Sequence, residues 1–467
     1  MSDFFQGLFK KRTVDLNQVK NSKLEKTLGA LGLTSMGVGA VVGAGIFITP
    51  GIIAALHAGP SAYLSFIIAA VVCALAALCY SEFASTIPLA GSAYTYVYVV
   101  FGEIVAWIIG WSLVSEYLFA VSSVAVSWSS YFQNLLGGFS IHLPGFLTQA
   151  YENGHGGVNL VAGLVILVIG FLLSLGLRES TKINEIMVFI KIAVIVLFVV
   201  VAAFYIKPEN YSPAMPNGLP GVLSGAAIAF YAYIGFDAVS TAAEEVKNPK
   251  RDMPIGIISS LIVASALYAA VAIVLVGVVH YTQLNVGDPV AFALQFINQN
   301  WVSGIVSLGA VAGMTTVLLV MAYGGTRLIF AISRDGLLPK SLSKVNPKTH
   351  VPVTNTVIFT VVAAIFATFI PLDKITELVN IGTLFAFATV SIGIIFLRNS
   401  KQYDKLDHPF KAPFYPVLPI VSFLACVFLM SQLKALTWQV FGIWFVLGLI
   451  IYFTYGRHNS KVQKTKR

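Results

Sequence analysis

Charged side chains are scarce in this chain of 467 residues. Asp, Glu, Lys and Arg make up 10% of it, against about 25% in an average soluble domain. Hydrophobic residues make up 57%, and the mean hydropathy is +0.84. A water-soluble protein of this length needs more charge to cover its surface, so the composition excludes that class. The chain is predicted to be an all-α integral membrane protein, because a helix satisfies its own backbone polar groups in lipid.

Cysteine is nearly absent, and no metal-binding or catalytic motif occurs. The three cysteines, Cys73, Cys79 and Cys426, lie in apolar runs, which predicts buried free thiols and no disulfide framework. The seven histidines are scattered, and the sequence contains no H-E-x-x-H, G-x-S-x-G or Walker A motif. We therefore expect no enzyme activity, no metal and no cofactor, so that any transport would depend on a gradient and not on bound ATP.

Long apolar stretches set the predicted organisation. About 20 apolar residues are needed to span a bilayer, and twelve stretches qualify: 29–56, 60–86, 95–130, 158–177, 184–206, 217–243, 254–280, 300–333, 353–370, 374–397, 413–432 and 437–455.

Basic residues predict the orientation. The net charge is +9, but the Lys and Arg residues lie in loops, so we expect no nucleic-acid partner. With both termini in the cytoplasm, 25 of the 29 Lys and Arg residues fall on the cytoplasmic side and three on the other side, as the positive-inside rule requires. We expect a monomer in the cell membrane, with a basic tail over residues 1–27 that either forms a short interfacial helix or is disordered.

Two of the twelve stretches are interrupted. Four glycines fall within residues 37–45, and a second interruption, Phe-Tyr-Ala-Tyr-Ile-Gly-Phe-Asp, covers residues 230–237. Glycine costs a helix interior up to ~1 kcal/mol, so the first pattern predicts either a broken helix or a GxxxG packing face. Interrupted spans one and six, five apart, indicate an inverted-repeat transporter with its site at the breaks. The helix ends freed there would match the charges of an α-amino acid zwitterion.

Several ionisable residues lie in or beside the apolar stretches. Such a charge costs at least ~2.5 kcal/mol at the bilayer centre and should face the protein interior or a water pathway. Lys191 has two interpretations. Its side chain either faces the protein interior or extends to the lipid headgroups, because it lies close to the start of its span. Glu103 is expected at the interface, and Glu244 and Glu245 are expected to cap span six. By contrast, Asp237 and Glu116 lie well inside their spans.

Three motifs resemble the amino acid–polyamine–organocation (APC) superfamily, and most closely its bacterial cationic amino acid transporter branch. They are Gly-Ala-Gly-Ile-Phe at 43–47, the segment 230–254 that ends in Asn-Pro-Lys-Arg-Asp-Met-Pro, and Ser-Arg-Asp-Gly-Leu-Leu-Pro at 333–339. The resemblance implies a leucine-transporter-type fold of two inverted five-helix repeats, over 28–206 and 207–397. Two further helices would follow at 398–455, and then a basic tail at 456–467.

The resemblance also implies a substrate site at the breaks around Gly43 and Ile234. The backbone amides of Ala44, Gly45 and Ile46 would bind a carboxylate, and carbonyls near Val41, Phe230, Tyr231 and Ile234 would bind an ammonium group. The Tyr231 ring would belong to an aromatic gate, and Met321 would line the side-chain pocket. Lys191 would take the place of a sodium ion, Asp237 would couple protons, and Glu116 would face a basic side chain of the substrate.

The function expected from these features is import of L-amino acids, small neutral or cationic, by proton symport through alternating access. The alternatives are an exchanger or sodium-coupled carrier, and a non-transporting amino acid sensor on the same scaffold. An ion channel is less well supported, because no filter motif is evident. Expected partners are the L-amino acid, protons and the lipid bilayer, with a sterol or a small membrane peptide at the flanks.

Overall fold

The computed structural model describes residues 8–11, 28–87, 92–151, 156–176, 181–237, 239, 246–349, 351–400, 403 and 410–464. Within them the regular structure is helical, and β-pairing is limited to three isolated bridges. The main helices are α3 (Ala30–Val41), α4 (Ala44–Ile53), α5 (Ala62–Thr86), α6 (Ser92–Val100), α7 (Glu103–Gly138), α8 (Leu160–Ser174), α9 (Thr181–Ala203), α10 (Gly218–Ala229), α12 (Pro249–Val278), α13 (Pro289–Phe296), α14 (Asn300–Arg334), α15 (Val353–Phe369), α16 (Leu372–Arg398), α17 (Val417–Ser431) and α18 (Ala435–Ile451).

The helices have the length and composition of membrane spans. Seven candidate spans in the described part of the chain are long and apolar enough to cross a bilayer, and five shorter apolar helices accompany them. The all-α membrane class is therefore confirmed. The cysteine prediction is also confirmed, because Cys73, Cys79 and Cys426 are buried free thiols.

The third apolar stretch differs from its prediction. A single span was expected over 95–130, but α6 ends at Val100 and α7 runs from Glu103 to Gly138. Gly102 separates them with φ +98°, and a Cβ there would lie 2.5 Å from the Phe9 backbone. Only glycine fits both the left-handed conformation and this close approach, so the chain turns here and the long helix begins eight residues later than expected.

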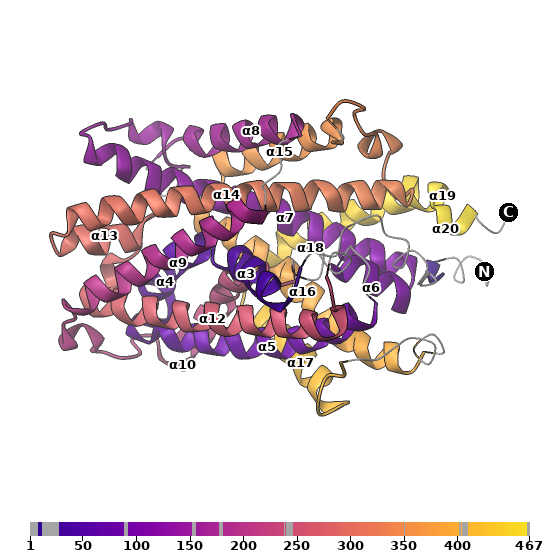
Figure 1. Cartoon of the computed structure of the whole chain (residues 1–467), viewed down its shortest axis with the longest axis horizontal. Coiled ribbons are helices and arrows are strands. Elements are labelled where there is room, and N and C mark those ends of the chain that lie inside the picture. Colours follow the sequence, from indigo (N-terminus) through magenta and orange to yellow (C-terminus); the bar gives the residue numbers. More distant parts are fainter. Residues whose placement is uncertain are drawn as a thin grey trace.

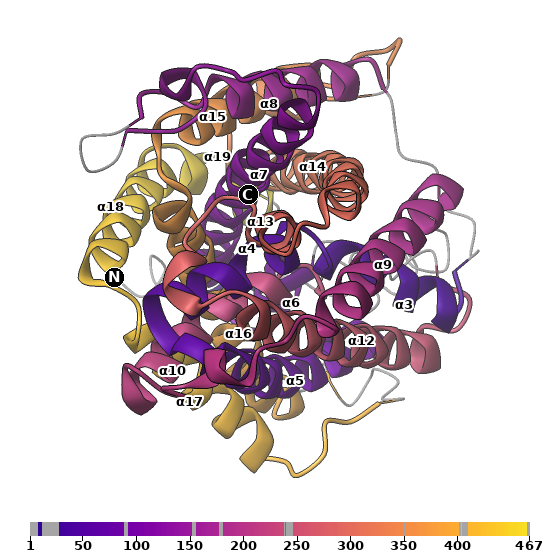
Figure 2. The same cartoon turned by 90° about the vertical axis from the view of Figure 1, so that its left-hand side faces the viewer.

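The long helices run roughly side by side (Figure 1), and α7 packs against both α14 and α16. On another side α12 packs against α3 and α5, while α8 pairs with α15 at one edge of the bundle (Figure 2). The short helix α13 lies at one end of the bundle, and α19 (Arg457–Asn459) and α20 (Lys461–Lys464) lie at the other. The first apolar stretch forms α3 and α4. Helix α4 is buried along its whole length, whereas α3 is buried mainly toward its C-terminal end.

Glu103 anchors the C-terminal segment at the α20 end of the bundle. Its side chain is fully buried and accepts hydrogen bonds from Tyr98 (3.0 Å), Tyr452 (2.9 Å), Gln463 (2.7 Å) and Ser460. Tertiary contacts from a distant part of the chain therefore cover Glu103, and its place at the membrane interface remains a prediction. The predicted interfacial helix of the N-terminal tail lies outside the described residues, apart from 8–11.

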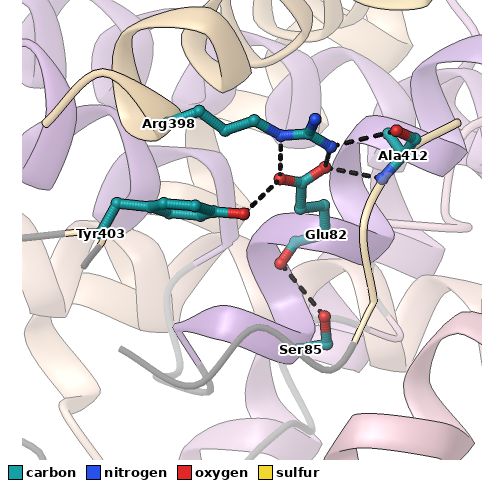
Figure 3. A network of polar contacts seen from close by, with 5 residues as sticks. All are labelled: Glu82, Ser85, Arg398, Tyr403 and Ala412. Atoms are coloured by element: carbon teal, nitrogen blue, oxygen red, sulfur yellow. Dashed lines mark hydrogen bonds and ion pairs between the residues drawn. The ribbon is translucent and has the colours of Figure 1, made fainter. Parts of the chain in front are cut away.

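A second buried carboxylate, Glu82 on α5, holds the chain that follows α16 (Figure 3). Arg398 pairs with it through two hydrogen bonds of 2.7 and 2.6 Å, and the backbone N–H of Ala412 donates to it at 2.7 Å. Tyr403 donates a longer bond of 3.4 Å. The bidentate pair thus fixes the α16–α17 connection to the end of α5.

Removing Arg398 should destabilise the protein. Arg398→Ala leaves the Glu82 carboxylate buried without its cation, which typically costs 3–5 kcal/mol. We therefore expect a large fall in the midpoint of thermal unfolding in detergent. The double variant Glu82→Gln/Arg398→Met removes both charges and should recover most of that loss. Equal melting temperatures for Arg398→Ala and the unmodified chain would contradict this account.

Candidate functional site

The first interruption separates α3 from α4. Helix α3 ends at Val41, Val42 leaves the helical region (φ −78°, ψ 75°), and α4 begins at Ala44. The N–H of Gly43 donates to Val41 O at 2.8 Å, whereas in a continuous helix it would bond to Gly39 O. Gly39 O is thereby released, and the first N–H groups of α4 have no acceptor within their helix. The predicted break in the first span is confirmed.

The second interruption ends α10. This helix stops at Ala229, a 3₁₀ turn covers Phe230–Tyr233, and Ile234 is extended with ψ 136°. Gly235 follows with φ +112°, a conformation that other residues rarely adopt. The chain therefore leaves the helix at the place that the sequence predicted.

The two interruptions contact one another directly. A Cβ on Gly45 would lie 2.7 Å from the Cα of Ala232, and a Cβ on Gly235 would lie 2.9 Å from Ala40 O. These glycines allow the two broken backbones to pack without side chains between them. Gly37, in the same first stretch, packs closely on another helix, because a Cβ on it would lie 2.6 Å from the Ser260 side chain on α12. The glycines thus provide both the break and the packing.

Tyr268 on α12 joins the two breaks. Its hydroxyl lies 2.7 Å from Val41 O and 2.6 Å from Ala232 O, and its side chain is fully buried. One hydroxyl has one proton to share between these carbonyl oxygens. Val41 O also accepts from the N–H of Gly43, whereas Ala232 O keeps a further lone pair with which it could accept from a cationic group.

Lys191 on α9 reaches the first break. Its side chain is 1% exposed, and its ammonium donates to Gly39 O at 3.1 Å, the carbonyl that the break releases. Gly313 on α14 makes room for the stem, because a Cβ there would lie 2.8 Å from Lys191 Cγ. The headgroup alternative for Lys191 is therefore wrong: the side chain points into the protein and not along the helix to the interface.

Two buried carboxyl groups lie near the second break. Glu116 on α7 is 4% exposed and Asp237 is 5% exposed, and the two interact electrostatically. The Oε2 atom of Glu116 has no hydrogen-bond partner within the described residues. The pair is thus a place where charge or a proton can be held inside the membrane. Glu244 and Glu245 lie outside the described residues, so their predicted capping role remains a prediction.

The predicted gate and pocket residues are buried beside these elements. The Tyr231 hydroxyl shares a hydrogen bond of 2.8 Å with Ser123 on α7. Val317 on α14 approaches Gly43, since a Cβ on that glycine would lie 3.4 Å from it. Met321 lies one turn further along the same helix and is buried at 7% exposure. Helix α14 thus runs past the first break.

Sequence reasoning missed Tyr268, Gly313 and Ser123. A tyrosine, a glycine and a serine are common in apolar helices, and their importance arises from partners on other elements of the fold. The predicted residues of the first break, Val41 to Ile46, and of the second, Phe230 to Asp237, lie on touching segments. Lys191 contacts the first of these segments directly.

Comparisons with known proteins identify the family. The model of the amino acid permease family matches residues 28–454. The chain is 49% identical to the methylthioribose transporter of Bacillus subtilis, with 98% of this chain and all of that protein covered. It is 48% identical to the branched-chain amino acid permease BcaP of the same organism, with 98% of this chain and 99% of that protein covered. It is 38% identical to the vacuolar cationic amino acid transporter 4 of Arabidopsis thaliana, with 84% of this chain and 67% of that protein covered. The chain therefore belongs to the amino acid permease family of the amino acid–polyamine–organocation superfamily and is a non-enzymatic, multi-pass membrane transporter.

Proposed function

We propose that this permease imports L-amino acids across the cell membrane by proton symport, with both termini in the cytoplasm. In this proposal the helices form twelve spans, of which the first ten are two inverted repeats of five. The observation that carries the proposal is the direct contact between the two helix breaks, which gather released backbone groups of both polarities in one place.

The substrate lies beside the contact between the two breaks, against their freed backbone groups. The N–H groups of Ala44, Gly45 and Ile46, at the positive end of α4, bind its carboxylate. The carbonyls near Val41 and in the segment 230–234 bind its ammonium group. Since both sets of groups belong to the backbone, this part of the site recognises the zwitterion that all α-amino acids share, and the side-chain pocket decides among them.

Charged side chains couple substrate transport to the movement of protons. The ammonium of Lys191 stands where a bound cation would otherwise hold the broken first span to span five, which removes the need for sodium. Two interacting carboxyl groups in a medium of low dielectric cannot both be ionised without a large cost. Asp237 and Glu116 therefore carry the transported proton between them, and alternating access exposes them in turn to each side of the membrane.

The substrate range is broad in this proposal. The relatives are named for branched-chain amino acids and for cationic amino acids, and a flexible methionine, Met321, accommodates varied side chains. The 49% identical relative named as a methylthioribose transporter supports a second candidate. Methylthioribose has neither a carboxylate nor an ammonium group, so its transport would have to use a different set of contacts.

Uptake into liposomes tests the proposal. Purified protein should accumulate labelled amino acid when the outside is acidic, and sodium should make no difference. A panel of twenty amino acids and methylthioribose, competing against one labelled substrate, defines the range. Uptake that requires sodium and does not change with a pH gradient would refute proton symport. Counterflow without net uptake would identify an exchanger, and binding without any flux would identify a sensor.

A further inference from the structure

A cavity of about 320 Å³ lies between α7, α15, α16 and α18. None of the residues that form the two helix breaks lines it. Its inner wall is apolar and includes Phe119, Phe366, Leu378 and Phe441. The volume falls at the lower end of the range of small-molecule sites, and the lining predicts a hydrocarbon occupant.

One wall of the cavity faces the membrane. Leu436, Ile443 and Leu447 on α18 line it, and their side chains are 53%, 64% and 47% exposed. In a multi-pass membrane protein, exposed apolar side chains on a spanning helix contact lipid hydrocarbon. The cavity is therefore open to acyl chains from the bilayer.

The mouth of the cavity is ionic. Lys374 is exposed there, and Lys434, with a side chain that is 58% exposed, pairs with Glu377 at 2.6 Å. Thr437 also donates to Glu377 at 2.8 Å, so the carboxylate is held in place and directs Lys434 to the cavity mouth. Asp373 also lines the cavity, so two carboxylates lie beside the two ammonium groups. Each ammonium has three N–H donors, so it can bind a carboxylate and, at the same time, a phosphate that is attached to an acyl chain.

We infer that this cavity binds one membrane phospholipid, with an acyl chain between α7 and α18 and its phosphate on Lys374 and Lys434. The apolar slot open to the bilayer accounts for the chain, and the two lysines account for the phosphate. A sterol has no anionic group and would make no use of the lysines. The site is independent of the transported substrate and of the proposed function.

Native mass spectrometry of the full-length, delipidated chain in detergent tests this inference. The probes are phosphatidylglycerol, diacylglycerol with the same acyl chains, and cholesterol. Contacts from two basic side chains should make phosphatidylglycerol bind about tenfold more tightly than diacylglycerol. Val440→Trp places a large side chain from α18 in the apolar slot, so it should lower the affinity for phosphatidylglycerol and for diacylglycerol by about tenfold.

Two lysine variants separate the headgroup contact from general surface charge. Lys374→Gln should weaken the binding of phosphatidylglycerol about fivefold and leave the binding of diacylglycerol unchanged. The matched control is Lys207→Gln, an exposed lysine that does not line the cavity. Its affinity for all three probes should equal that of the unmodified chain. The inference is overturned if Lys374→Gln and Lys207→Gln behave alike, or if diacylglycerol or cholesterol binds as tightly as phosphatidylglycerol. Because Lys374 is exposed, this comparison holds even if Val440→Trp fails to fold.

Discussion

Lys191→Ala should lower amino acid uptake by about 100-fold while the protein still folds. The ammonium of Lys191 donates to Gly39 O inside the bundle, and a hydrogen bond to a charged group contributes about 1.5–3 kcal/mol. Without it the released carbonyl loses its partner, and α3 is no longer held to α9. Uptake into liposomes measures the effect, and the elution profile and thermal unfolding of the purified variant report folding.

Two further variants separate charge from packing. Lys191→Met keeps most of the stem that packs on Gly313 and removes the ammonium, so it should be as inactive as Lys191→Ala. Lys207→Ala, at an exposed position, should transport normally. An active methionine variant would show that the lysine only fills space, and an active alanine variant would remove it from the mechanism altogether.

Gly45→Ala should reduce uptake by about tenfold or more. The added methyl group would lie 2.7 Å from the Cα of Ala232, a backbone atom that can yield only if the two breaks move apart. Overpacking of this kind costs about 1–3 kcal/mol, and each 1.4 kcal/mol corresponds to a tenfold change in rate or affinity. Substrate affinity and maximal uptake rate in liposomes measure the loss.

Gly304→Ala is the matched control for that substitution. Gly304 lies in α14, and nothing stands within 4 Å of a Cβ placed there. This variant should transport normally and unfold at the same or a higher temperature, because alanine favours helix. Equal activity of Gly45→Ala and Gly304→Ala would mean that the contact between the breaks has no role in transport.

The sequence predicted the two breaks because their causes are local. Four glycines within nine residues weaken a helix by themselves, and Gly235 allows the left-handed turn that ends the second break. A single glycine gives a much weaker signal. The separation of α6 from α7 was therefore missed, since it depends on how Gly102 meets Phe9, more than 90 positions away.

Partners of the buried charges could not be predicted in the same way. Glu103 was expected beside an apolar stretch, but the C-terminal segment that hydrogen-bonds to it comes from more than 300 residues later, as does Arg398, the partner of Glu82. Tyr268 gives no pattern of its own, because a tyrosine in an apolar helix is ordinary until two carbonyls are found at its hydroxyl. Long-range pairing of this kind is decided by tertiary packing.

Binding of matched analogues tests the central claim most directly. The purified protein is titrated with the L-amino acid that competes best for uptake, with the amine lacking its carboxylate, with the acid lacking its amino group, and with methylthioribose. If released amides and carbonyls at the two breaks hold a zwitterion, each truncation should weaken binding by about 100-fold, since a charged hydrogen-bonding group is lost each time. Binding of the amine, the acid or methylthioribose as tight as that of the amino acid would contradict the account.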